Sequence, residues 1–223
     1  APESDLMLDP HPPAERVEQI LNKYHFRNVH EAFKNLMLLA TEEVAFLSSN
    51  RCRHFLASIA PQLLRAIAEA PDPDMALVNM EKVTASLGAK GVLWESLSNN
   101  PPMLRLYVNL CSWSQFLSEI LINNPGMIDE LLDTLIMNQL RTRETMGSEL
   151  ARLLKGAKEI GLILQSFKNT ELLGIGVQDI IGKRSIRETT RNLSDLAEII
   201  LGNLADHHYV RLVERFGPPM TSE

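Results

Sequence analysis

The stretch Leu93–Leu104, LWESLSNNPPML, contains the local pattern that decides the fold class. Its first half places Leu93 and Leu97 one helical turn apart, and Asn100 then stands directly before Pro101. An asparagine side chain can accept a free backbone N–H at the start of a helix, and proline is favoured at the first helical position because it needs no N–H partner there. The stretch therefore predicts a helix, a tight Asn-Asn-Pro turn and a second helix.

The same pattern returns in Leu117–Ile128, LSEILINNPGMI, at an offset of 24 residues. The two stretches share a glutamate, two leucines, the Asn-Asn-Pro triplet and a methionine at Met103 and Met127. Two copies are fewer than a solenoid needs to bury a continuous core. The repeat therefore predicts two similar helical corners within one bundle.

Helix-forming residues dominate the rest of the chain, and alternating runs of β-branched residues are missing. The segment Pro2–Pro13 holds four prolines and predicts an extended leader. A helix over about Asn50–Ala70 contains Pro61, which is expected to kink or divide it because proline lacks a backbone donor. An amphipathic helix is predicted to follow Pro13, with Val17, Ile20 and Leu21 on one apolar stripe.

Capping residues mark the helix starts. They are Asn28, Asp72, Asn100, Asn124 and Ser185, the last paired with Glu188 in a capping box. A long helix is predicted from about Gly147 to Lys168, and a shorter one around Glu171–Ile181, ended by Gly182. The last helix is expected to present one apolar face, made of Ile186, Thr189, Leu193, Leu196, Ala197, Ile200 and Leu204. The sequence as a whole predicts an all-α bundle of nine or ten helices.

Composition excludes several classes of protein. The 223 residues are 45% hydrophobic and 22% charged, which is typical of globular proteins. The net charge of −6 argues against a nucleic-acid binder, because such proteins need a basic face. No apolar run is long enough to span a bilayer, and the acidic first ten residues do not resemble a secretory signal. Two cysteines fit a reducing compartment, so a cytoplasmic location is expected.

Two stretches have features of ligand sites. Gly176–Lys183 resembles a phosphate-binding loop, but its spacing fails and a helix end would present carbonyl groups to phosphate. Asp129 and Asp133 stand one helical turn apart, as in magnesium–diphosphate sites, but no second acidic cluster has matching spacing. Acidic residues also stabilise a first helical turn without any ligand. The sequence therefore predicts no metal, cofactor or catalytic residue.

Histidines and cysteines do not cluster at ligand spacing. Cys52 with His54, and His207 with His208, each supply only two ligands, and zinc needs three or four. A nucleophilic Cys–His pair remains an alternative. Cys52 and Cys111 lie among apolar residues, however, and this pattern favours small buried side chains over reactive thiols.

Two wider sets of residues, methionines and basic side chains, each allow a functional and a structural interpretation. Methionines could form an adaptable partner groove or fill a core: Met75, Met80, Met103, Met127 and Met137. A basic stretch is interrupted by glutamates and predicts a solvated helix face: Arg141, Arg143, Arg152, Lys155 and Lys158.

Three stretches in order resemble a known family. They are Cys111–Asp133 (CSWSQFLSEILINNPGMIDELLD), Phe167–Gly182 (FKNTELLGIGVQDIIG) and Glu188–Glu198 (ETTRNLSDLAE). Together with Pro61–Asp74 (PQLLRAIAEAPDPD), they are similar to the middle of the bifunctional glutamine synthetase adenylyltransferase/adenylyl-removing enzyme. The resemblance covers roughly residues 28–219.

That resemblance implies a parent enzyme that transfers AMP from ATP to a tyrosine of glutamine synthetase and removes it by phosphorolysis. It implies ATP and magnesium as cofactors of the parent, and glutamine synthetase and the PII signalling protein as its partners. The family's Gly-x-Gly-Lys-x-Gly-Gly turn does not occur here, and the only Asp-x-Asp is Asp72-Pro-Asp74, without a glycine loop. The expectation is therefore a non-catalytic central helical region that lacks both active sites.

The expected organisation has three parts. Residues 1–27 form a leader and a first helix, residues 28–146 a helical connector, and residues 147–223 the helices before the second nucleotidyltransferase core. If the chain forms two lobes, the break is expected within Asn138–Gly147. Two alternatives remain open: an independent helical protein-binding module with a groove around Asn100 and Asn124, and an all-α magnesium enzyme that uses Asp129 and Asp133.

Overall fold

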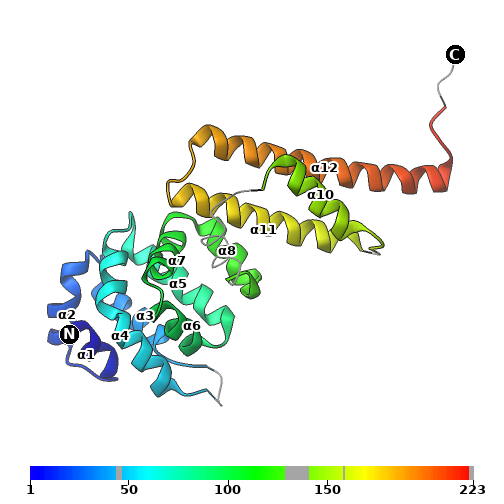
Figure 1. Cartoon of the computed structure of the whole chain (residues 1–223). Helices are drawn as coiled ribbons and strands as arrows, with labels where there is room; N and C mark the ends of the chain where they lie inside the picture. The colour runs from blue at the N-terminus through cyan, green and yellow to red at the C-terminus, as the bar shows by residue number, and fades with distance from the viewer. Residues whose placement is uncertain (44–46, 129–140, 158, 221–223) are drawn as a thin grey trace. The chain divides into compact units, whose positions relative to one another are not determined.

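The computed structural model describes residues 1–43, 47–128, 141–157 and 159–220. These residues contain eleven α-helices, two short 3-10 helices and no strand (Figure 1). The all-α class is confirmed, with slightly more helices than predicted. The chain divides into two compact units, unit 1 with residues 1–137 and unit 2 with residues 138–223, and each is described by itself.

In unit 1, α4 packs against α1, α6 and α7, while α5 packs against α3, α7 and α8. The described elements are α1 (Pro2–Leu8), α2 (Ala14–Leu21), η1 (Asn22–Tyr24), α3 (Val29–Leu39), α4 (Ser49–Ala68), α5 (Pro73–Leu87), α6 (Lys90–Ser98), α7 (Pro101–Trp113), α8 (Gln115–Asn123) and η2 (Pro125–Met127).

The extended leader predicted over Pro2–Pro13 is wrong in its first half, which forms helix α1. Pro2 occupies a first-turn position, where its missing N–H costs nothing, and Leu6 and Met7 are completely buried. The buried Glu3 carboxylate accepts hydrogen bonds from Lys23 Nζ at 2.5 Å and from the Tyr24 hydroxyl at 2.7 Å. These contacts attach α1 to the chain that follows α2.

Helix α4 runs without a break through Pro61, so the predicted division does not occur. Apolar side chains on both sides of Pro61, including Ala57, Ala60 and Leu64, are buried and hold the two halves in one helix. Arg65 Nε donates to the Pro61 carbonyl at 2.9 Å. Tertiary packing therefore outweighs the local cost of the proline.

The predicted caps are confirmed at Asn28, Asp72, Asn100 and Ser185, each of which accepts a backbone N–H from the first turn of its helix. The expectation fails at Asn124, which does not cap a helix with its side chain. Its Nδ2 instead donates back to the Ile120 carbonyl at 2.8 Å, and Pro125 begins the 3-10 helix η2. The two halves of the repeat thus differ after their turns.

Helices α4 and α6 approach closely at Gly91. The Glu42 carboxylate accepts the backbone N–H of Gly91 at 2.6 Å and that of Lys90 at 3.3 Å, so it caps the start of α6. The Lys90 side chain is buried, and its Nζ donates to the Leu38 carbonyl at 3.0 Å. A side chain at position 91 would meet the backbone of Cys52.

Unit 2 contains α10 (Arg143–Leu154), α11 (Ile160–Ile180) and α12 (Ile186–Phe216) in its described residues. The predicted helix Gly147–Lys168 is therefore wrong, because α10 ends at Leu154 and α11 runs through the expected boundary before Glu171. Gly156 has φ +76°, a left-handed conformation that glycine adopts readily and that interrupts a helix. The core of unit 2 is formed by Met146, Leu150, Leu164, Phe167, Ile175 and Leu196.

We expect Glu3→Gln to lower the free energy of unfolding by about 1–2 kcal/mol at pH 7. The hydrogen bond from Lys23, opposed by burial and aided by Tyr24, lowers the pKa of Glu3 from 4.5 to about 2. A carboxylate with a lowered folded-state pKa contributes stability above the unfolded-state value and loses it as pH falls. In urea titrations the difference between wild type and variant should shrink between pH 4.5 and about 2.

The control for that experiment is Glu15→Gln, which changes an exposed carboxylate on α2. It should change the stability by no more than about 0.5 kcal/mol at any pH, because an exposed acidic residue in a first helical turn interacts only weakly with the helix dipole. A Glu3→Gln effect that stays constant from pH 7 to pH 2 would contradict the role given to the Glu3 charge.

We expect Gly91→Ala to destabilise unit 1 by about 1–3 kcal/mol, because its Cβ would lie 3.3 Å from Cys52 Cα and 3.2 Å from Glu42 Oε1. The matched variant is Gly174→Ala within α11, where a Cβ meets no atom within 4 Å. It should stabilise the chain by up to about 1 kcal/mol, because alanine favours a helix over glycine. Thermal unfolding of both variants checks this, and effects of the same sign would refute it.

Candidate functional site

The magnesium candidates Asp129 and Asp133 lie outside the described residues. Within the part of the chain that the structure describes, no three His, Cys, Asp or Glu side chains group closely enough to hold a metal ion. Among the same residues, no helix is long and apolar enough to cross a membrane.

Gly176–Lys183 is the end of helix α11 and its exit turn. Gly182 has φ +68°, its N–H donates to the Asp179 carbonyl at 2.9 Å, and the N–H of Lys183 donates to the Gln178 carbonyl at 3.1 Å. These two bonds form a Schellman motif, which closes a helix C-terminus. The prediction that Gly182 ends a helix is confirmed.

Both cysteines are buried, as predicted. Cys52 Sγ donates to the Leu39 carbonyl at 3.4 Å, and the His54 ring packs edge-on against Phe55 with centroids 5.7 Å apart. Burial raises the pKa of the Cys52 thiol to about 12, and burial likewise raises the pKa of Cys111 to about 12. A thiol held protonated in this way is a poor nucleophile.

The basic stretch is used for contacts within unit 2. Arg141 pairs with Glu171 at 2.6 Å, and Arg152 pairs with Glu149 at 2.7 Å on the same helix. Arg143 bridges α10 to α12 by pairing with Asp195 at 3.3 Å and Glu198 at 2.5 Å. Lys158 lies outside the described residues. Arg141 and Arg143 therefore join separate parts of unit 2, whereas the Arg152 pair lies within α10.

The methionines mostly fill the core. Met80, Met103 and Met127 are buried and Met75 is half-buried, whereas Met137 lies outside the described residues. Beside the two Asn-Asn-Pro turns, Asn99 Nδ2 donates to the Glu95 carbonyl at 2.9 Å and Asn123 Nδ2 to the Glu119 carbonyl at 2.8 Å. The repeat thus has the same hydrogen bond in both copies, with its methionines turned inward.

A hollow in unit 1, roughly 420 Å³ in volume, is lined in part by Arg27, Asp72, Asp74 and Lys82. Arg27 pairs with Asp72 and, at 3.5 Å, with Asp74, and this contact holds the chain before α3 against the start of α5. The Arg27 hydrogen bond lowers the pKa of Asp72, which also caps α5. Arg27, Asp72 and Asp74 therefore stabilise the fold of unit 1.

Helix α12 does not have the single apolar face that was predicted. Thr189 and Leu196 are buried, and Ile200 and Leu204 pack against the core of unit 2. Ile186, Leu193 and Ala197 are exposed, so that part of the prediction is wrong. The predicted stripe is wider than the face that α10 and α11 cover, and its edge remains in solvent.

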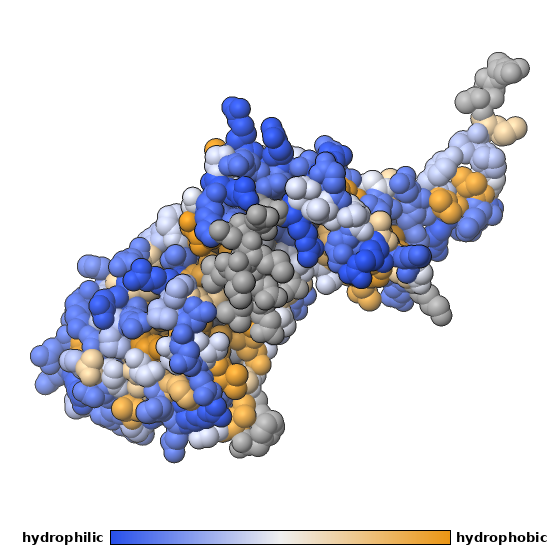
Figure 2. Space-filling view, viewed as in Figure 1, coloured by the Kyte–Doolittle hydropathy of each residue, from blue (hydrophilic) through white to orange (hydrophobic). Residues whose placement is uncertain are grey.

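The end of α12, residues 205–216, is the feature that the sequence analysis missed. Tyr209, Leu212 and Phe216 recur at three- and four-residue steps and share one side of the helix, and 55%, 55% and 70% of their surface is exposed. In the space-filling view an apolar group lies at this end of α12 beside hydrophilic residues (Figure 2). This α12 end is the candidate interaction site.

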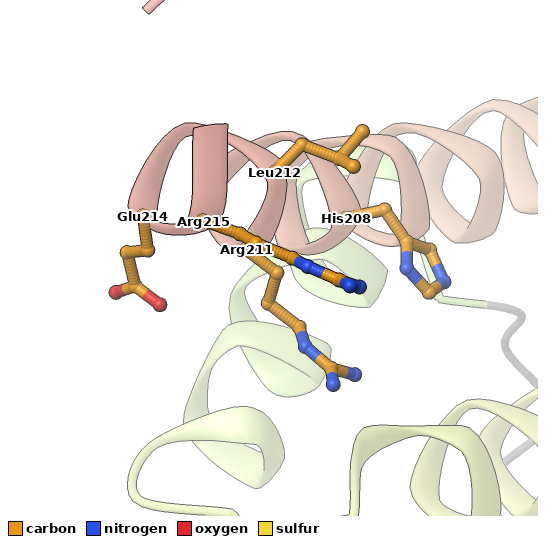
Figure 3. Close-up of a pocket in the computed structure, with 5 residues that line it drawn as sticks. All are labelled: His208, Arg211, Leu212, Glu214 and Arg215. Carbon is orange, nitrogen blue, oxygen red and sulfur yellow. The ribbon is translucent and has the colours of Figure 1, made fainter. Parts of the chain in front are cut away.

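The α12 end also bears charged residues of both signs, Asp206 and Glu214 beside Arg211 and Arg215. His208, Arg211, Leu212, Glu214 and Arg215 line an open hollow of roughly 520 Å³. In Figure 3 the Arg211 and Arg215 side chains extend toward the side of the helix that carries His208, and Glu214 points away. Arg215 lies 4.9 Å from the centre of the Phe216 ring. The arrangement suits a partner surface that offers carboxylates next to apolar groups.

We expect neither cysteine to react with iodoacetamide at pH 8 in the folded chain, because both thiols are buried and protonated. Intact-mass measurement should show no added group over an hour, and two after unfolding in guanidinium. Rapid native modification of Cys52 that disappears in His54→Ala would contradict this and support the Cys–His alternative.

The sequence pattern of the glutamate-ammonia ligase adenylyltransferase family matches residues 104–223, more than half of the chain. Three similar curated proteins are each described as a bifunctional glutamine synthetase adenylyltransferase/adenylyl-removing enzyme.

The protein of Thioalkalivibrio sulfidiphilus is 26% identical over 210 residues, which covers 92% of this chain and 22% of the relative. That of Pasteurella multocida is 28% identical over 210 residues, covering 91% of the chain and 21% of the relative. That of Agrobacterium fabrum is 29% identical over 156 residues, covering 69% and 16%. The chain spans about a fifth of the length of the first two relatives.

Proposed function

Since the chain belongs to the glutamate-ammonia ligase adenylyltransferase family, we propose that it serves as a non-catalytic helical segment of such an enzyme. The parent enzyme would transfer AMP from ATP to a tyrosine of glutamine synthetase and remove it by phosphorolysis. This chain would connect and support the domains that carry out the chemistry.

The proposal rests on the contacts of the charged and polar side chains, which join helices or cap them. Glu3, Arg27 and Arg143 each join separate elements of the fold, and Asp72, one half of the only Asp-x-Asp pair, is the cap of α5. Ligand-binding sites direct several unpaired polar groups into one pocket, whereas in the hollow of unit 1 Arg27 pairs with Asp72 and Asp74. This pattern supports a structural role.

The assignment of segments follows the family resemblance. We assign residues 28–146 to the connector between two nucleotidyltransferase domains, and residues 147–223 to the helices before the second one, with residues 1–27 leading into the connector. ATP, magnesium, glutamine synthetase and the PII protein would bind to parts of the cytoplasmic parent enzyme. We assign none of these to a residue of this chain.

A connector of this kind also has a regulatory use. A regulatory signal that raises the activity of one catalytic centre and lowers that of the other can act through an element with two arrangements, each of which favours one centre. Helices packed through buried faces transmit displacement as rigid bodies, because close-packed cores resist gradual deformation. The proposal therefore includes passive support and mechanical communication between the catalytic domains.

The test is an AMP-transfer assay with radiolabelled ATP, magnesium and unmodified glutamine synthetase. The 223-residue chain should give no labelling above background, whereas the full-length gene product should label glutamine synthetase. Circular dichroism of the same preparation should show a helical chain, so that inactivity is not due to unfolding. ATP-dependent labelling by the chain alone would overturn the proposal.

A further inference from the structure

We propose that the α12 end, residues 205–216, is a docking surface for polypeptide that lies outside this chain in the same full-length enzyme. The contact would combine an apolar side made by Tyr209, Leu212 and Phe216 with a basic side made by Arg211 and Arg215. This inference rests on the proposed function, because it requires that the chain is one part of a larger enzyme.

The first argument is the lack of support for this part of α12. Leu204 is the last apolar residue of the helix that packs against the core of unit 2. Residues 205–216 continue for about 18 Å at 1.5 Å per residue. A helical extension of three turns is only marginally stable by itself in water. Burial of its apolar side against a partner would provide the missing stabilisation.

The second argument is the kind of surface that is exposed. Tyr209, Leu212 and Phe216 are large side chains with more than half of their area exposed, and Val210 is similarly exposed on another side of the helix. Contiguous exposed apolar side chains of this size are typical of interaction surfaces, with aromatic residues as their anchors.

The third argument is charge. In the described residues Arg27, Arg141, Arg143 and Arg152 each pair with a carboxylate, whereas Arg65, Arg105, Arg187 and Arg191 do not. No described carboxylate pairs with Arg211 or Arg215, although the chain has more acidic than basic residues. The helix dipole favours one cation in the last turn, which accounts for Arg215 but not for Arg211 one turn earlier. The arginine side chains extend to the side of the helix that carries His208, so that side offers two cations to carboxylates of a partner (Figure 3).

The occupant follows from the comparison with relatives. The family match runs through all of α12, so the α12 end belongs to the part shared with the family. The relatives hold about four-fifths of their length outside the region that this chain matches. Polypeptide of the same enzyme is therefore the partner that is always present beside this helix, at the high effective concentration that a covalent connection provides.

Hydrogen–deuterium exchange tests this by comparing the 223-residue chain with the full-length gene product. Amides of residues 205–216 should exchange at least tenfold more slowly in the full-length protein. Equal exchange in the two proteins would overturn the proposal, as would a coding sequence that ends at Glu223. Protection that appears in the short chain only at high concentration, with a dimer in sedimentation, would identify a second copy instead and also overturn it.

Variants of the full-length protein identify the contact. Leu212→Glu should remove the protection of residues 205–216, and the control Leu162→Glu, which alters a 70% exposed leucine on α11, should not. The double variant Arg211→Glu/Arg215→Glu should also remove this protection from exchange. The control double variant Arg187→Glu/Arg191→Glu, on the same helix, should retain the protection. Identical behaviour of test and control variants would refute the docking surface.

The exchange readout is independent of the AMP-transfer assay. If the short chain proves catalytically active, the proposed function fails while exchange at the α12 end still reports whether that end is covered. If the short chain is inactive and the α12 end exchanges equally in both proteins, only the docking surface is refuted.

Discussion

The burial of helix α4 is the constraint on which unit 1 depends. Helices α1, α6 and α7 all pack against it, and its inward side chains are Cys52, Leu56, Ala57, Ile59, Ala60, Leu63, Leu64 and Ile67. A helix covered on several sides cannot shift without exposing a large apolar area at each contact. That is why the proline at position 61 is tolerated, and why Gly91 is needed where α6 comes closest.

Local signals in the sequence predicted helix starts well and helix ends less well. A cap such as Asn28 or Asp72 acts within three residues, so its effect is readable from the sequence alone. The break after Leu154 depends on Gly156, which has a left-handed conformation. Other glycines, such as Gly161 and Gly174, lie inside helix α11, so the sequence does not show which glycine ends a helix. The helix α1 was missed because its stability comes from Leu6 and Met7 packing in unit 1, which a count of prolines does not reveal.

The candidate site was harder to predict than the fold. The spacing of apolar residues along α12 shows which side chains lie on one side of the helix, but not which of them another helix covers. Covered and exposed residues have the same periodicity. Leu196 and Leu212 therefore look alike in the sequence, yet one lies in the core and the other in solvent. The absence of the family's Gly-x-Gly-Lys-x-Gly-Gly turn from this chain, in contrast, is visible in the sequence itself.

The turn between α11 and α12 has a mechanical consequence. It reverses the chain within a few residues, with the Schellman motif at Gly182 closing one helix and the Ser185–Glu188 capping box opening the next. A 31-residue helix leaving that corner is a rod roughly 46 Å long at 1.5 Å per residue. Because α12 packs against the core of unit 2 as far as Leu204, that length is fixed in direction, and a bend of about 5° beyond Leu204 would displace the tip, roughly 18 Å further on, by only about 1.6 Å.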